Sequence, residues 1–291
     1  PTRMTLARAK ALRLFGDGLV RSKAEAAQEA GVSAGVIDGL IDEGTLETVL
    51  LPPEKVAQPP DPDFRKPDFV LTQLAAADAL RTTVAQGGYT VTLLDGVTGS
   101  GKTAVYFEGV AENIRRKKQS LILMPEIALT AQFLDRFTER FGTRPAEWHS
   151  QLTPRLRART WAAVAGNEVP VVVGARSALF LPYADLGLII VDEEHDPAYK
   201  QEDGAHYHAR DMAVVRGRAA KIPVVLASAT PSVESEVNAR RGRYKRIHLP
   251  ERFGGQLMPS IEAIDMRREG PPRGRFISPK LAEAVQIALE R

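Results

Sequence analysis

The feature that most restricts the fold of this chain is a glycine-rich octapeptide, Gly-Val-Thr-Gly-Ser-Gly-Lys-Thr, at residues 96–103. It follows the apolar run 90–94, typical of a buried strand, and precedes the helix-forming segment 104–116. A G-x-x-x-x-G-K-T sequence between a strand and a helix indicates a phosphate-binding loop, whereas a chance match in a glycine turn lacks that context. Glycines allow the loop to curl its backbone N–H groups toward phosphates at close range. The residues expected to bind nucleotide are Gly96, Val97, Thr98, Gly99, Ser100, Gly101, Lys102 and Thr103.

Two acidic residues follow a second apolar strand. Residues 186–191 form a continuous apolar run that ends in Asp192 and Glu193. Parallel buried strands deliver their C-terminal residues to one sheet edge, so these acids should lie beside the phosphate-binding loop. An isolated pair of acids at a strand end is also compatible with a solvated turn. With the loop present, we expect Lys102 to contact the β- and γ-phosphates, Thr103 and Asp192 to hold Mg²⁺, and Glu193 to orient or deprotonate the attacking water.

The form D-E-x-H at residues 192–195 resembles the superfamily 2 helicases and translocases, and other motifs of that group occur in order along the chain. Residues 125–132 and 171–180 resemble the elements that contact the nucleic-acid backbone in that group. Residues 228–230 match the S-A-T sequence that links nucleotide state to strand movement, although Ser and Thr after a strand commonly just cap the next helix. The site residues implied by this resemblance are Arg176, Ser177, Ser228 and Thr230.

A polar stretch rich in aromatic residues follows the acids, at residues 192–211. Aromatic rings beside cations suit single-stranded nucleic acid, because bases stack on the rings while cations contact phosphates. The sequence D-E-E-H-D-x-x-Y-K-Q, followed by Y-H-A-R-D, resembles the family of the bacterial primosomal protein N′, the replication-restart helicases. The resemblance implies that this loop couples DNA binding to ATP hydrolysis. Two alternatives to a DNA-binding role are a core position for Tyr207 and a metal site formed by the three histidines at 195, 206 and 208. The expected DNA-binding or coupling residues are Tyr199, Lys200, Tyr207 and Arg210.

Residues 1–51 are expected to form a separate winged-helix domain. Helical spacing of apolar residues predicts helices at 5–15, 22–30 and 33–43, followed by a strand-like segment at 45–51. Helix, glycine turn, helix and a short β element is the pattern of a winged helix-turn-helix. The third helix carries three acids and no Lys or Arg, which disfavours base reading in a major groove. Contact with fork DNA or packing between domains is therefore an equal alternative to sequence recognition.

A proline-rich stretch at 52–66 predicts an extended linker without a pattern of burial. The first RecA-like helicase lobe is then expected to span residues 67–249. Near its start, Gln73 precedes an Ala-rich helix at 74–83 and occupies the place of the adenine-reading glutamine of helicases. A glutamine amide both donates to and accepts from the adenine edge, which favours ATP.

Residues 250–291 are expected to begin an incomplete second helicase lobe. We predict a strand at 259–266 and a helix at 278–290 that opens with a Ser-Pro cap. The resemblance implies that a zinc module and the motif that supplies an arginine to the ATPase site come later in full-length members, so zinc is expected only in that missing part. The chain begins with proline rather than methionine, which suggests an excised piece that should not unwind DNA by itself.

Composition restricts the function only broadly. The net charge of +3 excludes a polycationic binder, and the chain contains no cysteine. No apolar run approaches the length of a membrane span, and we expect a cytoplasmic protein without membrane contact.

The expected fold class is therefore α/β: a winged-helix domain, a linker, a RecA-like P-loop NTPase lobe with a parallel sheet flanked by helices, and an incomplete second lobe. The resemblance implies an ATP- and Mg²⁺-dependent 3′ to 5′ DNA helicase that acts in replication restart at stalled forks. Its implied partners are single-stranded and forked DNA, the single-strand DNA-binding protein and primosome proteins. The alternatives are a duplex DNA translocase without strand separation and a non-catalytic winged-helix DNA-binding regulator.

Overall fold

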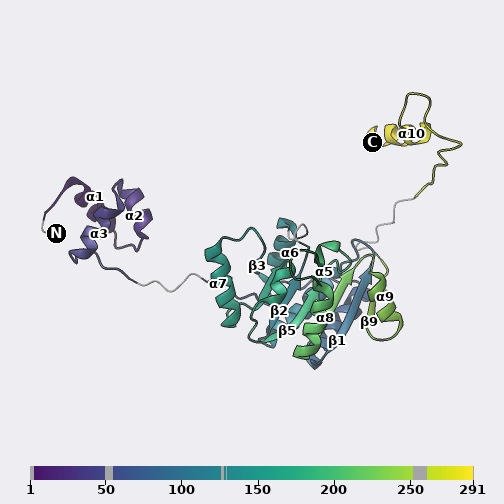
Figure 1. The fold of residues 1–291 in the computed structure, drawn as a ribbon, viewed down its shortest axis with the longest axis horizontal. Coiled ribbons are helices and arrows are strands. Elements are labelled where there is room, and N and C mark those ends of the chain that lie inside the picture. The colour runs from purple at the N-terminus through teal and green to yellow at the C-terminus, as the bar shows by residue number, and fades with distance from the viewer. Residues whose placement is uncertain (1–2, 50–54, 126–127, 129, 252–260, 291) are drawn as a thin grey trace. The chain divides into compact units, whose positions relative to one another are not determined.

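The computed structural model describes residues 3–49, 55–125, 128, 130–251 and 261–290. The chain divides into two compact units, Pro1–Lys55 and Val56–Arg291. Each unit has its own core, and Figure 1 shows the helices and strands of both.

The first unit consists of the helices α1 (Leu6–Phe15), α2 (Lys23–Ala30) and α3 (Ala34–Asp42), which confirms the three predicted helices. Ser22 begins α2 with a capping box, in which its hydroxyl accepts a hydrogen bond from Glu25 N–H and the Glu25 carboxylate accepts one from Ser22 N–H. Both orphan amides at that helix start are thereby satisfied. The buried side chains that form the small core are Ala11, Ala26, Ala27, Ile37 and Leu40.

The predicted wing of this unit is not confirmed. Residues 45–49 contain no strand, and residues 50–51 lie outside the described residues. One acid of α3 forms an ion pair within the unit, since Asp38 lies 2.7 Å from Lys23. Glu43, which follows α3, lies 2.7 Å from Arg8. The described part of this unit is therefore a three-helix arrangement, and its assignment as a winged helix stays a prediction.

The second unit contains a seven-stranded sheet in the order β3-β4-β2-β5-β8-β1-β9. Every described pairing within it is parallel, as in β1 against β8, where Leu94 lies opposite Ala227. A parallel sheet needs helices on both faces, so its central strands, such as β5 and β8, are buried along their whole length. The strands are β1 (Thr90–Gly96), β2 (Gln119–Leu123), β3 (Ala146–Trp148), β4 (Val171–Gly174), β5 (Leu186–Val191), β8 (Pro223–Ser228) and β9 (Lys245–Leu249).

Helices cover the two faces of this sheet and give three layers (Figure 1). One face packs against α4 (Leu71–Gln86), α5 (Lys102–Arg115) and α6 (Ala131–Phe141). The other packs against α7 (Pro154–Ala165) and α8 (Ala209–Ala220). Neighbouring strand residues divide between the two cores, as Leu93 and Leu94 do. The remaining elements are the 3₁₀ helices η2 (Arg176–Phe180) and η3 (Pro197–Tyr199), the two-stranded sheet of β6 (Lys200–Gln201) and β7 (Tyr207–His208), and the helices α9 (Val233–Arg240) and α10 (Pro279–Leu289).

The proline-rich stretch is only partly the free linker that was expected. Residues 56–66 belong to the second unit. Pro60 is buried, the Pro62 carbonyl accepts a hydrogen bond from Arg140, and Asp63 pairs with Arg115 at 2.9 Å. The stretch was misjudged because its prolines and acids carry no periodic signal, while the cations they meet lie on α5 and α6.

After Leu249 the predictions are confirmed in one part and wrong in another. Helix α10 begins after Ser278, whose hydroxyl accepts a hydrogen bond from Leu281 N–H, as the Ser-Pro cap predicted. The predicted strand at 259–266 is wrong for residues 261–266, which carry no strand, and 259–260 lie outside the described residues. No described helix is both long enough and apolar enough to span a bilayer.

Candidate nucleotide site and its connections

The glycine-rich loop joins the end of β1 to the start of α5, as predicted. Gly99 and Gly101 adopt φ angles of 81° and 86°, in the left-handed region that other residues enter only with strain. A Cβ on Gly101 would lie 2.6 Å from the amide nitrogen of Gln73, whereas a Cβ on Gly99 would meet nothing within 4 Å. The loop is therefore packed on its inner side and open at Gly99.

Lys102 is buried at the first position of α5 and is held by the loop itself. Its Nζ donates to the carbonyls of Gly96 at 2.8 Å and Val97 at 3.4 Å. Burial lowers the pKa of the Lys102 ammonium, and the nearby carboxylates of Glu193 and Asp192 act against that shift. An ammonium held only by neutral carbonyls in this position fits the binding of an anion.

The loop also contains an unsatisfied buried group. Ser100 Oγ is buried and has no hydrogen-bond partner among the described residues. Buried hydroxyls are nearly always satisfied, so such an atom indicates a ligand contact or a strained position. Together with the ammonium of Lys102 and the open side at Gly99, this donor set fits a polyphosphate chain.

The two acids lie at the C-terminal end of β5, where the prediction placed them. Asp192 is buried, and its carboxylate accepts hydrogen bonds from Tyr106 O–H at 2.9 Å and from Glu193 N–H at 3.1 Å. Burial raises the pKa of the Asp192 carboxyl to about 6. Glu193 has a positive φ of 47°, and 42% of its side chain is exposed. One acid is thus enclosed and the other faces solvent.

Tyr106, which sequence reasoning missed, connects the two expected Mg²⁺ ligands. It is fully buried on α5, and its hydroxyl oxygen takes part in hydrogen bonds with Asp192 and with the Thr103 side chain. Burial raises the pKa of the Tyr106 phenol well above its ordinary value, so the phenol remains a donor to Asp192. Its position three residues after Thr103, one helical turn, was the available signal.

Gln73 lies inside α4 rather than before a helix at 74–83, and its amide supports the phosphate-binding loop. Its Nε2 donates to the Ser100 carbonyl at 2.8 Å, and its Oε1 accepts from Val70 N–H at 3.2 Å. The side chain is buried. Adenine recognition by this amide stays a prediction.

The S-A-T segment lies next to the acidic motif. Ser228 Oγ is 2.8 Å from His195 Nδ1 and accepts a hydrogen bond from Thr230 N–H at 3.0 Å. His195 Nδ1 also lies 3.6 Å from the Glu193 carboxylate. A chain of contacts therefore runs from the exposed acid to the end of β8.

Two residues expected to bind DNA are buried. Tyr199 is 1% exposed, and its hydroxyl contacts the backbone carbonyls of Leu123 at 3.0 Å and Asp192 at 2.5 Å. Arg210 is 6% exposed and donates to Glu194 and Ser232. Neither side chain is open to DNA in this conformation, and the role of both residues in DNA binding stays a prediction. A coupling role is still compatible with these contacts.

Among the other expected residues, Lys200 and Ser177 are exposed and Arg176 and Tyr207 are partly exposed, whereas Ser228 is buried. Lys200 is exposed and pairs with Glu202 at 2.7 Å, and Tyr207 packs edge-on against Phe180. Arg176 donates to the Lys200 carbonyl at 2.9 Å, and exposed Ser177 accepts a hydrogen bond from Trp148 Nε1. Residues 126, 127 and 129 of the motif at 125–132 lie outside the described residues.

A third acid, Glu194, forms a network that sequence reasoning did not identify. Its carboxylate is fully buried and accepts hydrogen bonds from Ser232 N–H, Ser232 O–H and Ser235 O–H. Arg210 Nη1 lies 3.3 Å from the same carboxylate. The network ties the end of β5 to the start of α9.

Strand β9 closes the other flank of β1. Asp95, directly before the glycine-rich loop, is buried and lies 2.7 Å from Arg246 and 2.9 Å from His248. A Cβ on Gly96 would lie 2.5 Å from the carbonyl of Leu249. The start of the loop is therefore packed against the last strand of the sheet.

Comparison with known proteins agrees with this geometry. The family model of DEAD/DEAH box helicases matches residues 73–238. Replication restart protein PriA of Rickettsia felis is 43% identical over 222 residues, which cover 76% of this chain and 34% of that protein. PriA of Bacillus subtilis is 39% identical over 258 residues, which cover 87% of this chain and 32% of that protein.

The chain spans about a third of the length of these curated relatives. Among solved structures, the Hef helicase domain of Pyrococcus furiosus is 20% identical with a TM-score of 0.44, over 62% of this chain and 38% of that chain. The expected relation to replication-restart helicases is confirmed by the curated relatives. The chain belongs to the DEAD/DEAH box helicase family, within which it is related to the replication restart protein PriA.

Proposed function

We propose that the second unit is the ATP-hydrolysing lobe of a 3′ to 5′ DNA helicase that acts in replication restart. The observation that carries the proposal is the meeting of Lys102, Asp192 and Glu193 at one edge of the sheet. The two carboxylates act electrostatically on the buried ammonium, although 90 residues of chain separate it from Asp192. Such a constellation is the minimum that phosphoryl transfer to water requires.

Each residue has a separate task in this proposal. The backbone N–H groups of the loop and the Lys102 ammonium bind the β- and γ-phosphates, once Lys102 leaves the Gly96 and Val97 carbonyls. Thr103 and Asp192 would hold Mg²⁺, which neutralises charge that develops on the phosphates. Glu193, with its carboxylate in solvent, orients the attacking water.

DNA would bind on the side of η2 and the β6–β7 hairpin. Arg176, Ser177, Lys200 and Tyr207 are the accessible residues there, and Arg176 holds the hairpin backbone. Tyr199 lies between this hairpin and the nucleotide site, because its hydroxyl contacts the Asp192 carbonyl. We propose that a movement of the hairpin reaches Asp192 through Tyr199, and reaches Glu193 through Ser228, Thr230 and His195.

The experiment compares two variants of the chain in binding of a fluorescent ATP analogue with Mg²⁺. Lys102→Ala should weaken binding at least about tenfold, because it removes a direct phosphate contact. Glu193→Gln should bind within about twofold of the parent and lose hydrolysis, because it removes only a water-orienting group. The exposed residues Lys245 and Glu168 provide matched controls, as Lys245→Ala and Glu168→Gln. Equal affinity of the parent and Lys102→Ala would refute the assignment of the loop.

The remaining proposals concern the whole protein. Forked and single-stranded DNA, the single-strand DNA-binding protein and primosome proteins are its proposed partners. A non-catalytic DNA-binding regulator would have no use for Lys102, Asp192 and Glu193 together. ATP hydrolysis by the parent that is lost in Glu193→Gln would therefore favour the helicase over the regulator.

A further inference from the structure

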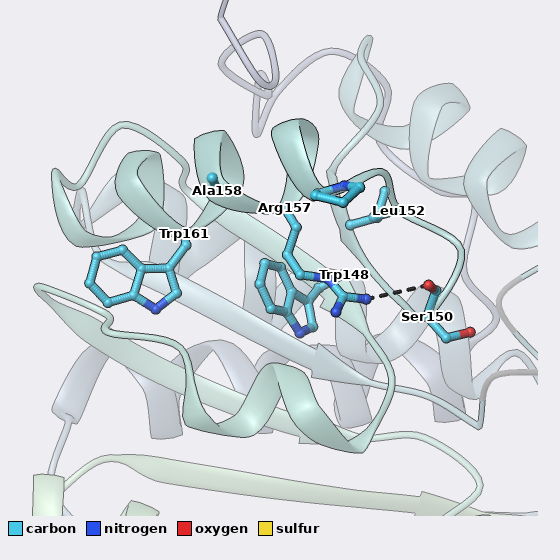
Figure 2. A pocket seen from close by; sticks show the side chains of 7 residues that line it. Trp148, Ser150, Leu152, Arg157, Ala158 and Trp161 are labelled. Atoms are coloured by element: carbon cyan, nitrogen blue, oxygen red, sulfur yellow. Dashed lines mark hydrogen bonds between the residues drawn. The ribbon is translucent and has the colours of Figure 1, made fainter.

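A pocket of about 560 Å³ lies between β3, the segment that follows it and α7, on the face of the sheet that α7 and α8 cover. It is lined by Trp148, Ser150, Leu152, Pro154, Arg157, Ala158 and Trp161. The residues from α7 recur at intervals of three and four, so they form one face of the helix. Figure 2 shows Trp161 and Arg157 extending from α7 toward the side on which Trp148 lies.

The rings in this pocket are unusually open. Trp161 is 51% exposed, although a tryptophan normally contributes a large buried area. Trp148 is partly exposed, and the Arg157 guanidinium lies 5.5 Å from its ring centroid. Arg157 is held there by hydrogen bonds to the carbonyls of His149 and Ser150. One cation is therefore fixed over the Trp148 ring, in a pocket that also presents the half-exposed Trp161.

The charge around the pocket favours an anionic partner. Helix α7 carries Arg155, Arg157 and Arg159 and no acidic residue along its twelve positions. The acid nearest to the pocket in sequence, Glu147, lies 3.6 Å from His149 Nε2. A basic helix that also presents aromatic rings is suited to single-stranded nucleic acid, in which phosphates meet cations and bases meet rings.

The pocket also adjoins the proposed DNA path. Trp148 Nε1 donates to Ser177 Oγ at 3.1 Å, and Ser177 is one of the accessible residues expected to contact DNA. We propose that this pocket binds an unpaired base of single-stranded DNA, which stacks on the exposed Trp161 ring beside Trp148, while Arg157 and Arg155 contact the flanking phosphates. The inference rests on the proposed function, because it assumes that DNA passes along η2.

Trp148 and Trp161 are the two tryptophans of the chain, so tryptophan emission, excited selectively over the six tyrosines, reports on this pocket alone. The experiment titrates the 291-residue chain with an oligo-dT strand and, in parallel, with a strand of equal length made of abasic sites. Anisotropy of an end-labelled strand measures binding independently. We expect oligo-dT to quench the emission over the concentrations at which it binds, and the abasic strand to bind without this quenching, since it offers phosphates but no bases.

Variants separate stacking from charge. Trp161→Ala should weaken oligo-dT binding roughly fivefold or more and leave the abasic strand unaffected, whereas Trp161→Phe should recover most of the loss. Arg155→Ala, a change on the same helix outside the pocket lining, should weaken binding of both strands equally and keep the full quenching at saturation. Trp161 is half exposed, so these variants should fold, and circular dichroism with thermal melting checks this.

The other outcomes overturn the inference in distinguishable ways. Binding of oligo-dT without quenching, or with unchanged affinity in Trp161→Ala, removes the base from the pocket but leaves the proposed function intact. Absence of binding to either strand refutes both the pocket and the DNA part of the proposed function. A change in emission with protein concentration and without DNA would assign the pocket to a second copy of the chain.

Discussion

Asp192 and Glu194 are buried carboxylates two residues apart, yet their surroundings are opposite. Glu194 accepts hydrogen bonds from two serine hydroxyls and one backbone N–H, and it has the guanidinium of Arg210 beside it. Asp192 accepts from one phenol and one backbone N–H, and burial raises the pKa of its carboxyl to about 6. The contrast separates a charge that is compensated within the fold from a charge that is compensated less, which is the pattern expected of the proposed metal ligand.

The same contrast appears among the cations. Arg210 is surrounded by carboxylates, since Glu194 and Asp211 both lie within ion-pair distance of it. Lys102 is bound only to backbone carbonyls. Glu194 and Arg210, whose charges are compensated by side chains, connect β5 to α8 and α9. Asp192 and Lys102, which have fewer such contacts, lie at the glycine-rich loop. Incomplete compensation therefore marks the candidate site more clearly than burial does.

The largest expected effect comes from removing the compensation of Glu194. Arg210→Ala leaves a buried carboxylate without its guanidinium, which should lower the free energy of unfolding by about 3–5 kcal/mol. Urea unfolding measured by circular dichroism checks this. Arg218→Ala, a change of an exposed arginine on the same helix, is the control and should stay within about 0.5 kcal/mol. A loss of stability as small as in the control would show that the network is not structural.

Asp192→Asn should have the opposite effect and raise the free energy of unfolding of the metal-free protein. The pKa of Asp192 in the folded protein lies above the ordinary value of 3.8, so the native state binds the extra proton and the parent loses stability as pH rises from about 4 through 6. Above that range the variant should be more stable by about 1–2 kcal/mol, after allowance for the bond from Glu193 N–H that the amide weakens.

Thermal unfolding in EDTA at pH 4 and pH 7.5 measures this difference. The advantage of Asp192→Asn should disappear at pH 4, where the carboxyl is protonated in the native state and about half protonated in the unfolded chain. Asp192→Asn should also abolish the Mg²⁺-dependent part of the binding of the ATP analogue. A variant that is less stable than the parent at pH 7.5 would place Asp192 in the same class as Glu194.

Tyr106→Phe tests the smallest of the three effects. Removal of the phenol takes one donor from Asp192 and should cost about 1 kcal/mol of stability. It should also raise the Mg²⁺ concentration needed for half-maximal binding of the ATP analogue. Tyr183→Phe removes a hydroxyl that donates to the Ala178 carbonyl outside the site, so it should cost similar stability and leave the Mg²⁺ requirement unchanged. Equal Mg²⁺ curves for the two variants would make Tyr106 a structural residue only.

The sequence allowed prediction of the elements whose signal is local. The loop at 96–103, the acids after β5 and the helix caps at Ser22 and Ser278 are short motifs with a direct structural meaning. Partners distant in the chain were not predictable in the same way. Tyr199 was expected to stack on a base because a polar, aromatic segment has the same composition whether its rings face solvent or the core.

Two strands of the seven-stranded sheet were missed for physical reasons. Strand β3 has three residues, too few for a periodic pattern. Strand β9 reads Lys-Arg-Ile-His-Leu, and its charged residues hide the strand from a search for apolar runs. It is an edge strand, so only one of its two backbone edges pairs with another strand of the sheet. The Arg246 side chain forms an ion pair with Asp95, which is distant in the sequence. Charged edge strands protect a sheet against aggregation, which a search for apolar runs overlooks.

The position of β9 has a consequence for synthesis of the protein. His248 and Asp95 are 153 residues apart in the chain, yet their contact closes the flank of the strand that leads into the glycine-rich loop. At translation rates of about 5–20 residues per second, a ribosome needs roughly 8–30 s to deliver that partner. A nascent chain must therefore carry β1 without this neighbouring strand for that time. Pausing of the ribosome between these two positions would prolong the period in which an apolar strand edge is available to chaperones or to other chains.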